Sequence, residues 1–325
     1  MRTNKKSYFA RTAFTLVELL TSISIISILM LISLPAINSV RQSAYSIKCM
    51  SNIRSTGVAL LSYCISCDDY YPPAYTYSGS KSLENQLEEP VCGISHWSGL
   101  LLNEKYVSDE ILQCPTIPRG GLPPANTTLS NLESGQVCTV DSIIDNQAAR
   151  CAFTVNEALC PRNRFIENFE GALKVSRLVK SAEVKGPHNT VLMTEWIDDW
   201  KIVTNLVDNV SMSYMPVHGF KGMGKMWPDR YDLNMVKEEA IPCLAEGPYK
   251  RVAYYDLSAT PNTNRRYPSR LDWVGRNHGN NGKANFYYVD GHIESKTVYE
   301  SIDETDFEWG QIVYSIKGNN KVNEL

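Results

Sequence analysis

Three side chains near the C-terminal end of the chain, His278, Asp290 and His292, are of types that bind metals or transfer protons. An imidazole and a carboxylate at a hairpin end can bind zinc or calcium. The dipeptide Asp290-Gly291 also has a structural explanation, because it separates two strand-like runs within residues 284–295, and Asp-Gly there is a strong hairpin signal. The Asp290 side chain can then bond the backbone two residues on. We therefore predict a structural turn without a metal ion and keep calcium at Asp290 as the alternative.

Elsewhere the sequence lacks the short patterns that mark a catalytic centre. It contains no G-x-S-x-G, no H-E-x-x-H and no phosphate-binding glycine loop between a strand and a helix. The formal net charge is -3 and no basic patch with interleaved aromatic residues is present, so nucleic acid is not expected as a partner. We predict a non-enzymatic protein without a cofactor.

The cysteines indicate the redox environment. There are nine, at positions 49, 64, 67, 92, 114, 138, 151, 160 and 243. Spread along the chain in this way, they fit disulfides in an oxidising compartment better than a single metal site. Cys64 and Cys67 have the C-x-x-C spacing, but without a second pair they are weak evidence for zinc. The sequence leaves the disulfide connectivity open.

The elements that must position these groups begin with a long apolar segment. Residues 1–13 contain basic residues and no acid, and residues 14–37 form a run of 24 residues in which Glu18 is the only charge. A helix of that length rises about 36 Å, enough to cross a bilayer core of about 30 Å. The basic leader places the N-terminus in the cytoplasm and the rest of the chain outside it. A secretory signal peptide is the simpler alternative, but its apolar region is usually only about 7–15 residues long.

The helix is expected to continue beyond the apolar run, over residues 38–67. After Pro35, apolar and small residues recur at three- and four-residue spacing, which is typical of one buried helix face. They are Ile37, Val40, Ala44, Ile47, Met50, Ile53, Gly57, Leu61 and Cys64. Pro35 removes one internal hydrogen bond and should kink the helix. We predict that the first half lies in the membrane and that the second half packs on a globular head.

That head is predicted to span residues 68–325 and to belong to the α+β class. Residues 190–196 have the pattern of a buried strand, and residues 284–295 that of a hairpin. Two long tracts rich in glycine and proline, 114–146 and 205–270, indicate loop insertions. We therefore expect a long N-terminal helix packed on an antiparallel sheet that includes the hairpin.

The stretch Ala13-Phe14-Thr15-Leu16-Val17-Glu18 resembles the processing site of type IV prepilins and type II secretion pseudopilins. The resemblance implies that a prepilin peptidase and N-methyltransferase cuts after Ala13 and methylates Phe14. Ala13 departs from the glycine that this family normally has there. Glu18 then holds the acidic position, five residues into the mature chain, and Pro35 the position of the helix-kinking proline.

The same resemblance implies how subunits would join. In this family the acid meets the N-terminal amine of a neighbouring subunit, and pairing opposite charges offsets the cost of burying either one. Repeated head-to-tail contacts build a helical homo- or hetero-filament. The four serines within residues 22–33 would let helices approach closely, although they can equally bond carbonyls of their own helix.

A second resemblance covers more of the chain. Several landmarks are similar to bacterial pseudopilin-like proteins that have a C-terminal His-(nine residues)-Asp-Gly motif and a solute-binding-like domain. The landmarks are Cys49-Met50-Ser51-Asn52, Trp97 with Leu100-Leu101-Leu102, Cys114-Pro115, Thr154-Val155-Asn156, residues 184–193, and His278 with Asp290 and Gly291. Here eleven residues separate His278 from Asp290.

Together these observations predict a pilin-like structural subunit of a type II secretion or type IV pilus-like assembly. Its partners would be the prepilin peptidase, other pilin-like subunits and the inner membrane, which it would cross once with an extracytoplasmic, periplasmic head. The alternative is a membrane-anchored protein that binds a solute or glycan through its long loops.

Overall fold

The computed structural model describes residues 15–77, 93–138, 143–161, 177–205, 209–222, 239–242, 270–279, 282–303, 305–315 and 321–322. The chain divides into two units, Met1–Ala44 and Tyr45–Leu325. Helix α1, Leu16–Ser66, contributes to both. The leader 1–13 and Phe14 lie outside the described residues.

The described part of the first unit is the apolar beginning of α1. An 18-residue window with a mean hydropathy of 2.2 lies in this helix, and none of that window is buried. By length and composition α1 can cross a membrane. Pro35 lies inside the helix, which continues through it. Because proline has no N–H, the carbonyl of Leu31 loses its helical donor there.

The second unit buries the C-terminal part of α1, beginning at Cys49. The buried positions are Cys49, Asn52, Ile53, Thr56, Gly57, Ala59, Leu60 and Cys64. The buried face differs at its beginning from the face that the apolar spacing predicts, because Ile47 is 69% exposed. The expected positions Ile53, Gly57 and Cys64 are buried, and small and polar residues complete the observed face because they make specific contacts. The Asn52 side-chain amide, for example, donates to the carbonyl oxygen of Gln113 at 2.7 Å.

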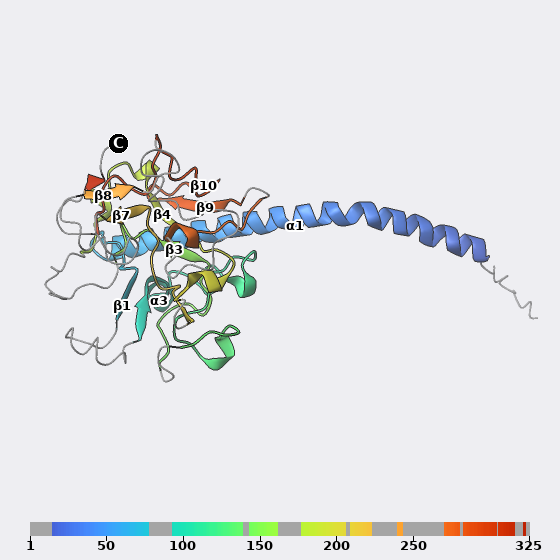
Figure 1. The fold of residues 1–325 in the computed structure, drawn as a ribbon, viewed down its shortest axis with the longest axis horizontal. Helices are drawn as coiled ribbons and strands as arrows, with labels where there is room; N and C mark the ends of the chain where they lie inside the picture. The colour runs from blue at the N-terminus through green and yellow to red at the C-terminus, as the bar shows by residue number, and fades with distance from the viewer. Residues whose placement is uncertain are drawn as a thin grey trace, which may run out of the picture. The chain divides into compact units, whose positions relative to one another are not determined.

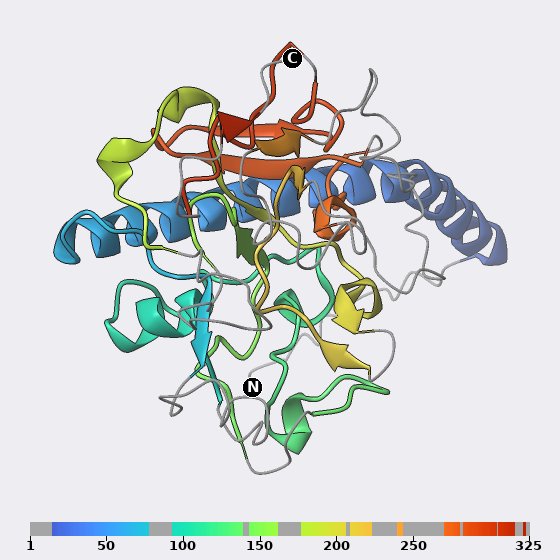
Figure 2. The ribbon, with the colours of Figure 1, turned by 60° about the vertical axis from the view of Figure 1, so that its left-hand side comes forward.

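Gly57 allows α1 to approach the sheet closely. A Cβ added at this position would lie 2.3 Å from Cζ of Tyr287, so the aromatic ring occupies the space that a side chain would fill. Figure 2 shows the C-terminal strands, in orange, lying along the helix. Helix and sheet are thus packed on each other, as the sequence predicts.

The sheet that meets α1 has four strands in the order β10-β9-β4-β3. They are β3 Phe153–Val155, β4 Val191–Glu195, β9 Ala284–Tyr288 and β10 Ile293–Lys296. All three pairings are antiparallel, and β9 and β10 form the predicted hairpin. All five side chains of β4 are buried, which agrees with its uninterrupted apolar start and its central place in the sheet.

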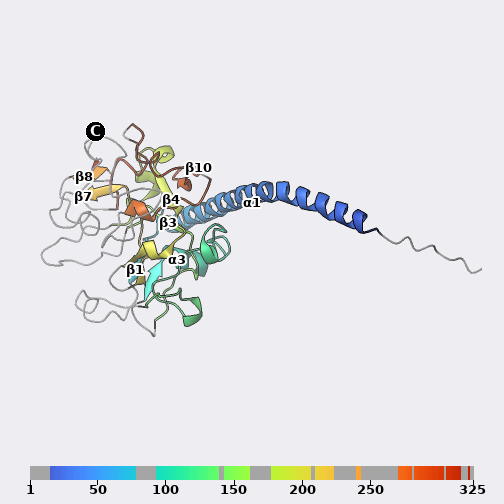
Figure 3. The same cartoon turned by 45° about the vertical axis from the view of Figure 1, so that its right-hand side comes forward.

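Short elements surround this sheet. On one side of α1 lie β1 Tyr75–Tyr77, β2 Ile94–His96 and α3 Trp97–Asn103, and on the other lie β7 Phe220–Gly222 and β8 Glu239–Pro242 (Figures 1 and 3). Strand β8 pairs antiparallel with β7 and parallel with β11 Lys321–Val322, and β5 Thr204–Asn205 pairs with β6 Val210–Ser211. The 3-10 helices are η1 Pro118–Gly120, η2 Leu129–Asn131, η3 Ser181–Glu183, η4 Pro187–Asn189, η5 Trp200–Val203 and η6 Arg270–Trp273.

Buried polar side chains join these segments. The Asn156 amide, at the end of β3, donates to the carbonyl oxygens of Val191 at 2.7 Å and Trp309 at 3.2 Å. Its own oxygen accepts from the Ala158 N–H at 3.0 Å. Asn156 therefore fixes β3, β4 and the C-terminal segment together. A long N-terminal helix with predominantly antiparallel sheets gives the α+β fold that the sequence predicts.

Candidate functional site

The acid of the apolar segment has a local role in the structure. Thr15 precedes the first residue of α1, and the Glu18 carboxylate accepts from the Thr15 N–H at 2.9 Å and from its hydroxyl at 2.8 Å. The Glu18 N–H donates back to the Thr15 hydroxyl at 3.2 Å. This is a capping box, which satisfies N–H groups that a helix start leaves without partners. Glu18 thus stabilises the start of α1 within one chain, whatever else it contacts.

The serines of the same segment also bond within their own helix. Ser22, Ser24, Ser27 and Ser33 donate to the carbonyl oxygens of Leu19, Leu20, Ile23 and Leu29. This is the second of the two explanations that the sequence allows. Their hydroxyl groups are satisfied inside the helix, so the surface they share with the exposed leucines and isoleucines is available for apolar contact.

The structure separates the residues of the C-terminal motif. Asp290 accepts from the His292 N–H at 3.1 Å and is 2.6 Å from the His292 Nδ1. The Gly291 N–H donates to the Tyr288 carbonyl at 3.0 Å, and Gly291 has a φ of +92°. This is a hairpin turn that ends in a left-handed glycine. His278 is not part of it.

The ionisation of Asp290 reflects the same contacts. Partial burial raises the pKa of its carboxyl, but the hydrogen bonds and charge of His292 outweigh burial, so the pKa lies below its usual value. The Asp290 carboxylate is thus held by the turn. Among the described residues, the potential metal ligands that lie close together are Cys49, Cys114, Glu195 and His278, and Asp290 is not one of them. Calcium at Asp290 stays a prediction.

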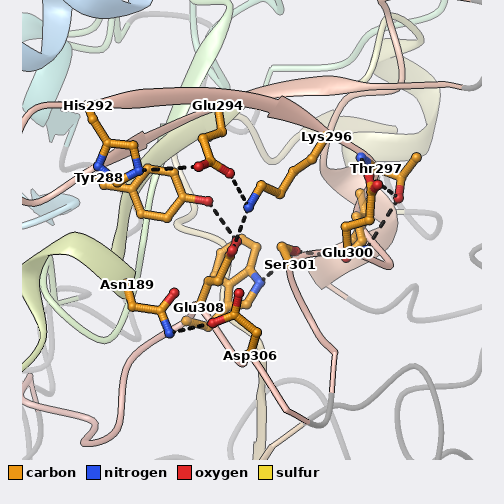
Figure 4. Close-up of polar contacts among 12 residues, drawn as sticks. Asn189, Tyr288, His292, Glu294, Lys296, Thr297, Glu300, Ser301, Asp306 and Glu308 are labelled. Atoms are coloured by element: carbon orange, nitrogen blue, oxygen red, sulfur yellow. Dashed lines mark hydrogen bonds and ion pairs between the residues drawn. The ribbon is translucent and has the colours of Figure 1, made fainter.

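Beside the hairpin lies a network of charged and aromatic residues, drawn in Figure 4. Lys296 on β10 forms ion pairs with Glu294 and with the buried Glu308. The Tyr288 hydroxyl donates to Glu308 at 2.7 Å, and the His292 ring stacks on the Tyr288 ring at 4.1 Å. Burial raises the pKa of Glu308 although both donors favour its charged form. This network ties the C-terminal segment to the hairpin.

His278 instead meets a carboxylate from the centre of the sheet. Its Nε2 is 2.9 Å from Oε2 of Glu195, at the end of β4. Glu195 also accepts from the Asn285 backbone N–H at 3.1 Å and from its side-chain amide at 2.9 Å. Cys49 and Cys114, joined as a disulfide, lie against this pair, so that the four ligand atoms fall within 4.8 Å of one another.

This buried cluster of Cys49, Cys114, Glu195 and His278 is the site that sequence reasoning missed. A signal was present, because Glu195 is an acid at the end of an otherwise uncharged strand. The partner of that acid depends on the strand order, which spacing alone does not give. The C-x-x-C pair is not joined: Cys64 and Cys67 are free, as are Cys138, Cys151 and Cys160. Cys92 and Cys243 lie outside the described residues.

Most of the described tryptophans are part of the core, and Trp200 is half-buried. Trp97, Trp196 and Trp309 are fully buried, and the Trp309 indole N–H donates to the Ser301 hydroxyl at 3.1 Å. Trp227 lies outside the described residues. In comparisons with known proteins, no family model, no curated protein and no solved structure matches this chain.

Proposed function

We propose that this chain is a non-enzymatic, pilin-like subunit of a type II secretion or type IV pilus-like assembly. It is cut after Ala13 and methylated at Phe14, is held in the inner membrane with its N-terminus in the cytoplasm, and has an extracytoplasmic head. The observation that carries the proposal is the first part of α1. This part is an apolar helical surface with none of its membrane-length window buried, and it contains a single acid, Glu18.

The physical argument concerns what can cover that surface. A lone chain leaves the large side chains of this segment exposed, including Leu16 at 74% and Leu31 at 76%. Lipid or the same helix of neighbouring subunits removes them from water, and Glu18 then needs a charge partner in a medium of low dielectric. The amine created by cleavage before Phe14 is such a partner. The α+β head on the same helix supports the proposal.

The capping box permits a sharp test. Glu18→Gln keeps the box, because glutamine also accepts from the N-cap residue, but removes the charge. Thr15→Ala removes the box and keeps the charge. If Glu18 pairs with a neighbour's amine, Glu18→Gln loses an ion pair worth about 3 kcal/mol and weakens the subunit contact about 100-fold. Thr15→Ala costs only about 1 kcal/mol of helix stability.

The readout is disulfide cross-linking between single cysteines introduced at the exposed positions Ile26 and Leu29 in native membranes. The proposal expects cross-linked multimers in wild type and Thr15→Ala and their loss in Glu18→Gln at equal membrane levels. Equal multimers in all three chains would refute the role of the Glu18 charge in assembly, and their absence from all three would refute assembly itself. Mass spectrometry of the native protein checks processing separately, since an intact Met1 contradicts cleavage after Ala13.

The alternative is the membrane-anchored solute- or glycan-binding protein. The burial of Trp196, Trp273 and Trp309 does not favour it, whereas Trp200 is half-buried. Such a protein would work as single copies in the membrane, so Glu18→Gln would leave its function unchanged.

A further inference from the structure

The cluster of Cys49, Cys114, Glu195 and His278 joins four distant segments at one buried point. Cys49 lies on α1, Cys114 in the loop before η1, Glu195 at the end of β4, and His278 after η6. The first three are fully buried and His278 is 3% exposed. Their ligand atoms lie within 4.8 Å of one another. Two cysteines, a glutamate and a histidine are rarely buried together unless they have a chemical role.

Two features show that the cluster is more than packing around a disulfide. The Glu195 carboxylate lies in the core, where an acid is costly unless it is paired. Its partner, His278, uses Nε2 for that contact, while Nδ1 is buried and has no hydrogen-bond partner among the described residues. An apolar pair of side chains would pack there at no such cost.

The donor set matches one ion closely. Two thiolates, one imidazole and one carboxylate are the ligands that tetrahedral Zn²⁺ takes in proteins, with bonds of about 2.0–2.3 Å. Ligand atoms around such an ion lie about 3.4–3.8 Å apart. Once the sulfur–sulfur bond is absent, small side-chain movements bring the four atoms of the cluster to that spacing.

The surroundings support the same conclusion. Carboxylates that bind a metal are usually held by further hydrogen bonds, and Asn285 donates twice to Glu195. The Thr116 hydroxyl is 2.9 Å from the Cys114 sulfur and so can donate to a thiolate there. Asn52, one helical turn after Cys49, holds the carbonyl of Gln113 and so fixes the loop that carries Cys114. Glu195 and Cys114 are thus each held by a neighbouring side chain.

We propose that Cys49 and Cys114 in their reduced form, together with Glu195 and His278, bind one zinc ion, and that the disulfide is the metal-free state of the same site. A small-molecule disulfide converts one state into the other. It takes two electrons from the two thiolates, which form the sulfur–sulfur bond. The reagent takes up two protons and becomes two thiols, and Zn²⁺ leaves. The site therefore changes between a zinc-bound and a disulfide form with the redox state of its surroundings, and it does so where α1 enters the head.

The test begins with the full chain in detergent. It is unfolded in reductant and refolded with zinc, or with oxidised glutathione before zinc is added, and the zinc bound after gel filtration is measured by elemental mass spectrometry. We expect about one zinc per chain in the first case and at least tenfold less in the second. Less than about a tenth of a zinc per chain in the reduced sample would overturn the proposal.

Variants identify the ligands. Cys49→Ser, Glu195→Gln and His278→Gln should each lower zinc affinity at least tenfold, whereas Cys151→Ser, which changes a buried free cysteine outside the cluster, should not. Equal loss in Cys151→Ser would contradict the assignment. Because a ligand variant can fail to fold, the wild-type chain is also refolded with Co²⁺. An absorption spectrum without the thiolate-to-cobalt band refutes thiolate ligation. The proposal does not depend on filament assembly, since Glu18→Gln should load zinc normally.

Discussion

Replacing Gly57 by alanine tests whether α1 is packed on the sheet as the structure has it. Alanine favours a helix over glycine by about 1 kcal/mol, so an unhindered position would gain that much. Here the new Cβ would lie 2.3 Å from Cζ and 2.5 Å from both Cε1 and Cε2 of Tyr287, and these three atoms belong to a buried ring. Helix and sheet must move apart, which costs about 3 kcal/mol for an overpacked core.

The net effect is a loss of about 2 kcal/mol, because the helix preference offsets part of the clash. For a head of this size that loss lowers the melting temperature by about 4–8 °C. The assay is thermal unfolding of the full chain in detergent, followed by circular dichroism and by hydrogen exchange of the amides in residues 45–66. The exchange should quicken around position 57 if the helix lifts from the sheet.

Two controls separate the clash from other effects of the substitution. Ser55→Ala changes an exposed residue of the same helix and should alter stability by less than about 0.5 kcal/mol. Tyr287→Leu removes the ring, so the double variant Gly57→Ala/Tyr287→Leu should be more stable than the sum of the single changes by at least about 1 kcal/mol. If Gly57→Ala instead stabilises the chain by about 1 kcal/mol, the close approach of helix and ring is refuted.

Three further predictions concern buried polar groups. Burial lowers the pKa of His96 to about 3, so below pH 6.5 only the unfolded chain takes up this proton, and His96 should remove about 2 kcal/mol of stability between pH 6.5 and pH 5. Denaturant unfolding at pH 6.5 and at pH 5 measures this loss, and the stability of His96→Gln should depend less on pH than that of the wild type. An equal pH dependence in the two chains would contradict the prediction. Asn156→Ala removes the hydrogen-bond partner of two buried carbonyl groups and one buried N–H group. It should lower the free energy of unfolding by about 2–4 kcal/mol in the same assay. Asn156→Asp, which lacks the donor, should not restore the stability, and full restoration would argue against the donor role. Lys296→Met leaves Glu308 buried without its cation and should cost about 3 kcal/mol, most of which the double variant with Glu308→Gln recovers. A double variant no more stable than the single one would refute the pairing.

The parts of the fold that sequence predicts are those with a strong local signal. The run 14–37 is long, apolar and nearly uncharged, and Asp290-Gly291 separates two strand-like runs, so the helix and the hairpin follow directly. The buried face of α1 is harder to predict. Hydrophobic spacing correctly places Ile53, Gly57 and Cys64 on this face, but it also favours Ile47, which the structure exposes, and it omits the buried Cys49 and Asn52.

The candidate site shows the same limit at longer range. His278 and Glu195 lie 83 residues apart in sequence and meet because β4 lies beside β9 in the sheet. No spacing rule connects an acid at the end of one strand to a histidine before another. Asp290, which is close to His278 in sequence, bonds instead to His292, since the turn satisfies it locally. Local hydrogen bonding thus determines the partner of Asp290, whereas the strand order determines the partner of His278.

The position of the Cys49–Cys114 link has a mechanical consequence. Cys49 is the first buried residue of α1, so it precedes every other buried residue of that helix. A force applied to the N-terminal end of the helix would peel it from the head one turn at a time if only packing held it. The covalent link is the first bond that such a force reaches, so peeling stops before Asn52 and Gly57 are strained. In a dithiol form without metal the same pull meets only packing and hydrogen bonds, and the head then detaches from its helix at a lower load.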